Sequence, residues 1–271
     1  MLESPWIAAV FALFVWWFST GAILWVVKGA DLRGRDAHQW SVILSLPLLV
    51  LGVAGLRETM TDDSIYGIYG AFLSALAIWG WIELSFLSGV ITGPNSETCP
   101  KGISEQDRFF RACGTIAYHE ILLTAVLALT LWLSWEAANT FGFWTFAVLY
   151  FARISAKLNL FLGVPKINVE FLPGPLAHLP SYFRFARLNA LFPASVTALS
   201  FAVACWLERI YGAATPADAV GFSLLAALTA LALLEHWLMV LPLPDERLWR
   251  WMIPVPKTNE KTLLREDGHG L

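Results

Sequence analysis

The sequence predicts an all-α, polytopic integral membrane protein that folds as a bundle of seven transmembrane helices. Of its 271 residues, 57% are hydrophobic and only 14% are charged, whereas a soluble domain has about 45–50% apolar and about 25% charged residues. This composition excludes a disordered chain, a disulfide-stapled secreted module and an ordinary soluble enzyme. The formal net charge of −3 offers no basic surface for nucleic acid. We therefore expect the lipid bilayer, and no nucleic acid, as a partner.

Seven stretches are apolar enough to cross a bilayer, which takes about 20 residues for about 30 Å of hydrocarbon. No basic residue precedes the first stretch, so we expect a retained anchor and not a cleaved signal peptide. The second carries Pro47, which predicts a kink. The third is long, which predicts a helix that tilts or extends past the headgroups. The predicted spans are residues 5–27, 40–56, 65–91, 113–135, 141–163, 189–211 and 218–240.

The distribution of lysine and arginine predicts the orientation of the bundle. Outside the predicted spans, 14 of these residues fall on one side of the membrane and two on the other. Cytoplasmic segments carry the excess of basic residues. We therefore expect a multi-pass protein of the bacterial inner membrane, with a periplasmic N-terminus and a cytoplasmic C-terminus.

The cytoplasmic segments differ in character. Residues 95–111 are polar and predict a surface loop. Residues 164–188 contain four prolines among apolar side chains, which predicts an interfacial segment that lies along the membrane or folds back under the bundle. We expect a transmembrane domain over residues 1–240 and a cytoplasmic tail over residues 241–271, which begins amphipathic and becomes charged.

Ionisable residues inside four of the spans predict a functional site. At 1.5 Å per residue they lie about 6–15 Å from the predicted cytoplasmic ends, so alternating helices place them at one depth in the inner-leaflet half. A charge at that depth costs several kcal/mol unless it is paired or hydrated. These residues are Glu83, His119, Glu120, Arg153, Lys157, Glu235 and His236.

Charge counting sharpens this prediction. Arg153 and Lys157 are four residues apart, so both project from one face of their helix toward the facing carboxylates. With neutral histidines the layer holds three acids and two bases, so two ion pairs leave one carboxylate free to hold a proton or a metal. Two simpler interpretations stay open: side chains that reach the headgroups, and buried ion pairs that only fix helix register.

Histidine and carboxylate side chains can ligate zinc or non-haem iron, and a neutral imidazole can ligate a magnesium porphyrinoid. The spacing matches no metal motif, because the sequence contains no HExxH, no pair of ExxH motifs and no clustered histidine boxes. The cofactor is therefore left open between a bacteriochlorophyll-type pigment and a divalent metal. The candidate metal ligands are His119, Glu120, Glu235 and His236.

Two long blocks resemble a known family. The run KLNLFLGVPKINVEFLPGPLAHLPSYF, residues 157–183, resembles the signature of the PuhE family of photosynthetic-complex assembly proteins, and LLEHWLMVLPLPDERLW, residues 233–249, resembles its second block. WIELSF (81–86) and YHE (118–120) are also similar to family elements. The family brings no established catalytic residue. Its blocks do add candidates near the predicted cytoplasmic end of the bundle, namely Asn159, Asn168, Glu170 and His178.

The resemblance implies an inner-membrane protein of anoxygenic phototrophic bacteria that supports reaction-centre and light-harvesting assembly and bacteriochlorophyll supply. On this hypothesis the ionisable site holds pigment or an apo-subunit. The partners are then reaction-centre and light-harvesting subunits or pigment-synthesis enzymes. The alternative is an integral-membrane enzyme, metal-dependent or not, that acts on a bacteriochlorophyll or isoprenoid intermediate. A transporter is disfavoured, because the charges occupy only one half of the membrane and no inverted repeat occurs.

Overall fold

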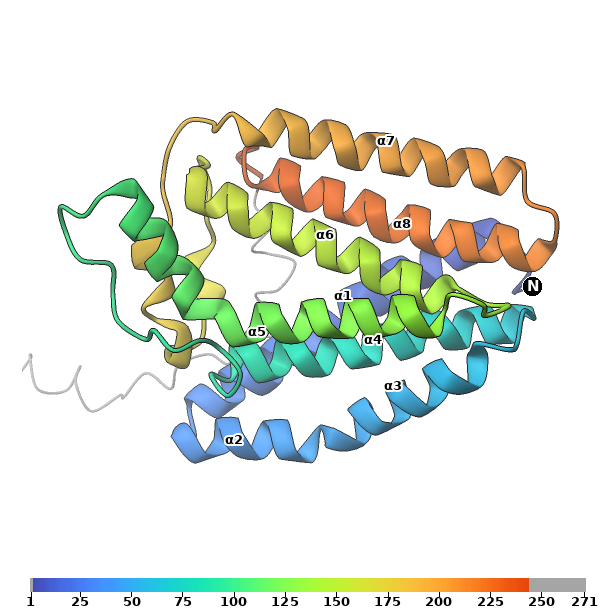
Figure 1. The fold of residues 1–271 in the computed structure, drawn as a ribbon, viewed down its shortest axis with the longest axis horizontal. Helices are drawn as coiled ribbons and strands as arrows, with labels where there is room; N and C mark the ends of the chain where they lie inside the picture. Colours follow the sequence, from blue (N-terminus) through green and yellow to red (C-terminus); the bar gives the residue numbers. More distant parts are fainter. Residues whose placement is uncertain (1, 244–271) are drawn as a thin grey trace, which may run out of the picture.

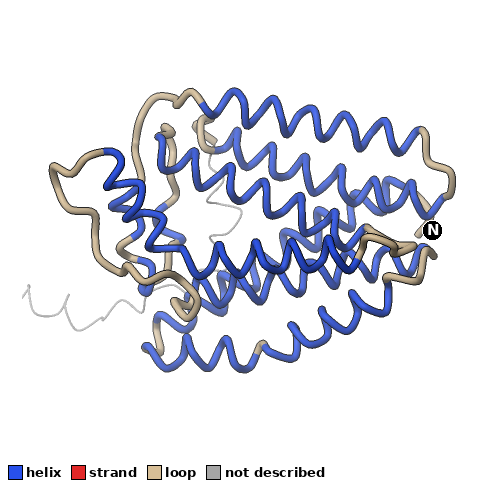
Figure 2. Tube along the Cα trace, viewed as in Figure 1, coloured by secondary structure: helices blue, strands red, loops and turns tan. Residues whose placement is uncertain are grey.

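The structure is a computed structural model that describes residues 2–243, so the predicted tail over 241–271 lies almost entirely outside the described residues. The described residues are helical and contain no β-strand beyond one isolated bridge between Val164 and Phe185 (Figure 2). The helices, shown in Figure 1, are α1 (Pro5–Asp31), α2 (Arg35–Leu44), α3 (Leu46–Thr59), α4 (Ile65–Leu87), α5 (Glu105–Leu133), α6 (Phe141–Leu162), α7 (Leu191–Tyr211) and α8 (Pro216–Leu238).

Seven helical units of the described chain are long and apolar enough to cross a membrane, as a multi-pass protein requires. One unit, Arg35–Thr59, consists of α2 and α3 together. The predicted kink at Pro47 is confirmed, because Ser45 separates the two helices just before this proline. Proline lacks the N–H that would continue the helix, and its ring clashes with the preceding turn.

Short polar side chains start three of the helices. The hydroxyls of Ser64, Ser104 and Thr215 accept backbone N–H groups three residues later, at 3.2, 3.1 and 3.0 Å, at the beginnings of α4, α5 and α8. Each satisfies a donor that has no partner within its helix. Just before α4, the Asp62 side chain accepts the backbone N–H of Ser64 at 2.9 Å. Hydrogen bonds from the side chain and the backbone of Ser64 lower the pKa of Asp62.

Several helix ends differ from the predicted spans by a few residues, and two of these differences have a visible structural cause. α5 begins at Glu105, eight residues before the predicted residue 113, so part of the predicted 95–111 loop is helical. The cap at Ser104 explains this extension, which the apolar pattern does not reveal. α4 ends at Leu87 instead of residue 91, because Gly89 turns the chain with a φ of 72°.

The helices α4 and α8 form the centre of the bundle, and α7 and the α2–α3 unit lie at opposite edges of Figure 1. The largest apolar core joins α1, α4, α6 and α8 through buried side chains. Phe72 of α4 and Leu225 of α8 are fully buried there, and Ala8 and Ala12 let α1 approach closely. The ionisable residues lie on α4, α5, α6 and α8, toward one end of this bundle.

That end, called the capped end below, carries residues 88–104 and the 164–188 segment. The segment contains three 3₁₀ turns, Val169–Phe171, Gly174–Leu176 and Leu179–Tyr182. Lys28 of α1 donates to the Leu172 carbonyl at 2.8 Å, and Arg108 of α5 donates to the Tyr182 carbonyl at 2.8 Å. The segment therefore folds back across the end of the bundle and is fastened to helices that are distant in sequence.

Residues 92–95 pack directly on the backbone of α5. The His119 N–H donates to the Thr92 carbonyl at 3.0 Å, and the Asn95 N–H donates to the Gly114 carbonyl at 3.1 Å. Gly93 lies between them, and a Cβ atom there would overlap the Gly114 carbonyl oxygen. Glycine is therefore required for space at this position.

We expect Gly93→Ala to lower the free energy of unfolding by about 1–3 kcal/mol, because the added methyl group overpacks a contact with backbone atoms. Gly29→Ala is the matched control, since a Cβ atom at Gly29 meets nothing within 4 Å. Unfolding of the two variants in detergent, followed by circular dichroism, checks this. Equal stability of the two variants would show that residues 92–95 do not pack tightly on α5.

Candidate functional site

Two ion pairs join α6 to α4 and α5 near the capped end. Arg153 donates from Nη2 to Oε2 of Glu83 at 2.7 Å. One turn further along α6, Lys157 donates to Oε1 of Glu120. The side chain of Glu83 is only 9% exposed and that of Glu120 only 21%. The four-residue spacing therefore places both cations of α6 against carboxylates of its neighbours.

His119 lies between these two carboxylates. Its Nε2 is 3.7 Å from Oε1 of Glu83 and 4.0 Å from Oε1 of Glu120, too far for hydrogen bonds. The ring is fully buried, with its centroid 4.3 Å from that of Phe86. Neither ring nitrogen has a hydrogen-bond partner among the described residues. His119 thus separates the two pairs within the protein interior.

A second polar network occupies the opposite face of α6. His236 of α8 lies 2.8 Å from the Ser155 hydroxyl through Nε2 and 2.7 Å from the Ala232 carbonyl through Nδ1. Because a carbonyl only accepts, Nδ1 carries the proton and Nε2 accepts from Ser155. Asn159 donates to the Ser195 hydroxyl of α7 at 3.0 Å and accepts from Asn189 at 3.0 Å.

The two networks separate because of helix geometry. Residues 153 and 155 are about 200° apart on α6, as are residues 157 and 159. The first network therefore faces α4 and α5, while the second joins α6 to α7 and α8. The sequence analysis missed Ser155, Asn189 and Ser195, although Ser155 and Asn159, spaced by four within an apolar span, were the available signal.

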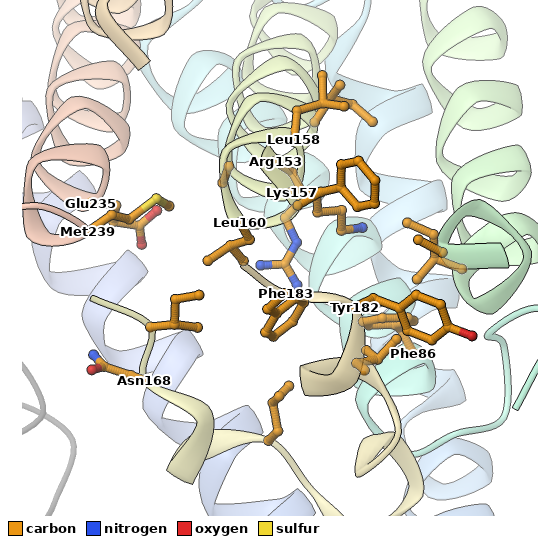
Figure 3. A pocket seen from close by; sticks show the side chains of 18 of the residues that line it. Phe86, Arg153, Lys157, Leu158, Leu160, Asn168, Tyr182, Phe183, Glu235 and Met239 are labelled. Atoms are coloured by element: carbon orange, nitrogen blue, oxygen red, sulfur yellow. The ribbon is translucent and has the colours of Figure 1, made fainter. Parts of the chain in front are cut away.

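A cavity of about 690 Å³ lies between α5, α6, α8 and the 164–188 segment (Figure 3). Ligand sites commonly enclose about 300–1,000 Å³, so it is large enough for a small molecule. Its wall is mostly apolar and includes aromatic side chains from distant parts of the chain, which the sequence analysis missed because no local pattern links them. These aromatic residues include Trp16, Phe86, Phe109, Tyr150, Tyr182 and Phe183.

Charged groups line one part of this cavity. Glu120 of α5 and Lys166 of the 164–188 segment line it. Arg153 and Lys157 face it from α6, and Glu235 faces it from α8 (Figure 3). Within residues 2–243 Glu235 has no hydrogen-bond or ion-pair partner. Three acids and two bases therefore leave a single unpaired carboxylate, and the structure identifies it as Glu235.

The other candidates are placed as follows. Asn168 lines the cavity, whereas Glu170 is exposed and neither Glu170 nor His178 contributes to the wall. Burial lowers the pKa of His178, so its ring is neutral at neutral pH. Neither His119 nor His236 lines the cavity. The described residues contain no group of three or more His, Cys, Asp or Glu side chains arranged to hold a metal ion.

The pair of the buried Glu83 and the partly exposed Arg153 gives a prediction for stability. We expect Arg153→Leu to lower the free energy of unfolding by roughly 3 kcal/mol, since it leaves the buried Glu83 carboxylate unpaired. Glu83→Leu should cost less, because the Arg153 side chain is 36% exposed and stays hydrated. The double variant should lose less than either single variant. Unfolding in detergent checks this, with Glu208→Leu on the exposed surface of α7 as control. Losses that simply add would contradict an energetic coupling between the two residues.

Comparisons with known proteins agree over nearly the whole chain. The family described as "Protein of unknown function (DUF3623)" matches residues 2–260. The chain is 57% identical over 253 residues, 93% of its own length and 92% of the relative's, to the "Uncharacterized 30.4 kDa protein in puhA 5′ region" of Rhodobacter capsulatus. No solved structure matches. The extent of the family match shows that the chain belongs to the DUF3623 family.

Proposed function

We propose that this protein supports the assembly of photosynthetic complexes by holding a pigment or a related amphiphilic molecule in its cavity. Two similarities support the photosynthetic context. The printed name of the Rhodobacter capsulatus relative refers to the region 5′ of puhA, and residues 157–183 and 233–249 resemble blocks of the PuhE family. The proposed location is the photosynthetic inner membrane of a bacterium.

The observation that carries the proposal is the cavity itself. Its apolar, aromatic wall suits a large apolar body, and its charged groups can orient a polar head. The cavity lies at the capped end, which the charge bias predicts to be cytoplasmic. A molecule in it would therefore reside in the inner leaflet, within reach of membrane-embedded subunits.

Holding a molecule accounts for these contacts better than a metal-dependent reaction. Arg153 and Lys157 are engaged by Glu83 and Glu120, both ring nitrogens of His236 are hydrogen-bonded, and His119 is buried beside Phe86. These groups stiffen the walls of the cavity. Reaction-centre and light-harvesting subunits, or pigment-synthesis enzymes, are the proposed partners for exchange of the molecule.

A cavity-filling variant tests this function. We expect Ala156→Trp to reduce the pigment that co-purifies from a phototrophic host by at least about tenfold, because the indole ring occupies the cavity and a loss of 1.4 kcal/mol already gives this factor. Absorption spectra of the purified protein, from the near ultraviolet to the near infrared, measure the pigment content.

Ala230→Trp is the matched control, since Ala230 lies on the exposed surface of α8 and outside the cavity wall. This variant should retain the pigment content of the unmodified protein. Equal pigment content in both tryptophan variants, or none in the unmodified protein, would contradict the proposed function.

A further inference from the structure

We infer that Glu235 is the protein ligand for an electropositive centre in the bound molecule, and that this centre is a divalent cation chelated in a flat, mainly apolar macrocycle. The inference rests on the proposed function and specifies the chemistry of the same cavity. Three features carry it: the charge balance of the cavity, the composition of its walls, and the engagement of the nearby histidines.

Among the described residues, the charge balance leaves Glu235 without an ion-pair partner. Two carboxylates of the layer are paired with Arg153 and Lys157. The third cation on the cavity wall, Lys166, donates to the Leu243 carbonyl. Glu235 lies close to the end of α8 with its side chain exposed on the wall of a mostly apolar cavity (Figure 3). An ionised carboxylate in such surroundings costs several kcal/mol unless a counter-charge or donor meets it. An electropositive centre in the bound molecule provides that partner.

The apolar wall of the cavity favours a chelated cation over a free, hydrated one. A free cation would have to shed its water against apolar and aromatic side chains, at a large cost in free energy. A divalent cation chelated by a dianionic macrocycle is neutral overall and keeps an axial position for one further ligand. Magnesium and similar hard cations prefer oxygen ligands such as a carboxylate. Aromatic rings contributed by α1, α4, α5 and the 164–188 segment can pack against a flat macrocycle.

Neither His119 nor His236 is available as a ligand for a molecule in the cavity. Nε2 of His236 accepts from Ser155, its Nδ1 donates to a backbone carbonyl, and the ring is only 1% exposed. His119 is exposed neither to solvent nor to the cavity, because it is buried between Glu83 and Glu120 against Phe86. Among the groups on the cavity wall, Glu235 is the carboxylate that no other described side chain neutralises.

The test compares two probes on three forms of the full-length protein. Zinc-loaded tetrapyrrole and its metal-free counterpart are titrated into the unmodified protein, Glu235→Leu and Glu208→Leu in detergent. We expect the unmodified protein and Glu208→Leu to bind the zinc form at least about tenfold more tightly than the metal-free form, a difference of 1.4 kcal/mol. Glu235→Leu should bind both forms alike and lack the absorption shift of axial ligation.

Each outcome decides the matter. Preference for the zinc form that persists in Glu235→Leu overturns the inference, as does equal binding of both probes to the unmodified protein, but either result leaves pigment holding intact. Failure of the unmodified protein to bind either probe overturns the proposed function as well. Glu235→Gln, which keeps the side-chain shape, serves as a second variant if Glu235→Leu fails to fold, and should weaken the preference, because a neutral amide oxygen is a poorer ligand than a carboxylate.

Discussion

The ion pairs of Arg153 and Lys157 are the interaction on which the other features of the site depend. Two cations and two carboxylates at this depth are tolerable only together, because each unpaired charge would cost several kcal/mol. Pairing with Glu83 and Glu120 fixes the rotation of α6. That rotation turns Ser155 and Asn159 toward α7 and α8, where they bond His236 and Ser195. One helix thus positions both networks and one wall of the cavity.

Much of the fold is predictable from the sequence because crossing a bilayer sets strict demands on length and polarity. The seven apolar units and the break before Pro47 follow from hydropathy and backbone chemistry alone. The start of α5 at Glu105 was missed because its first turn, residues 105–108, is polar, and only the cap at Ser104 marks it as helical. Helix ends that project beyond the apolar stretch leave no hydropathic signal.

The candidate site was predictable in composition but not in arrangement. Depth along each span brought the ionisable residues to one level, and charge counting required one unpaired carboxylate. The identity of that carboxylate depends on how each helix is rotated, and adjacent residues such as Glu235 and His236 point about 100° apart. The cavity depends on tertiary packing of segments as distant as Trp16 and Met239, which no local pattern encodes.

The long sequence separation of the cavity walls has a consequence for biogenesis. Trp16 belongs to the first helix to leave the ribosome, while Glu235 and Met239 follow at the end of the last helix. Proteins are synthesised from the N-terminus, so the wall from α8 is absent until nearly the whole chain has been made. A nascent chain cannot enclose a molecule in this cavity. On the proposed function, loading must then wait until α8 has been made, because a chain truncated before α8 lacks one wall of the cavity.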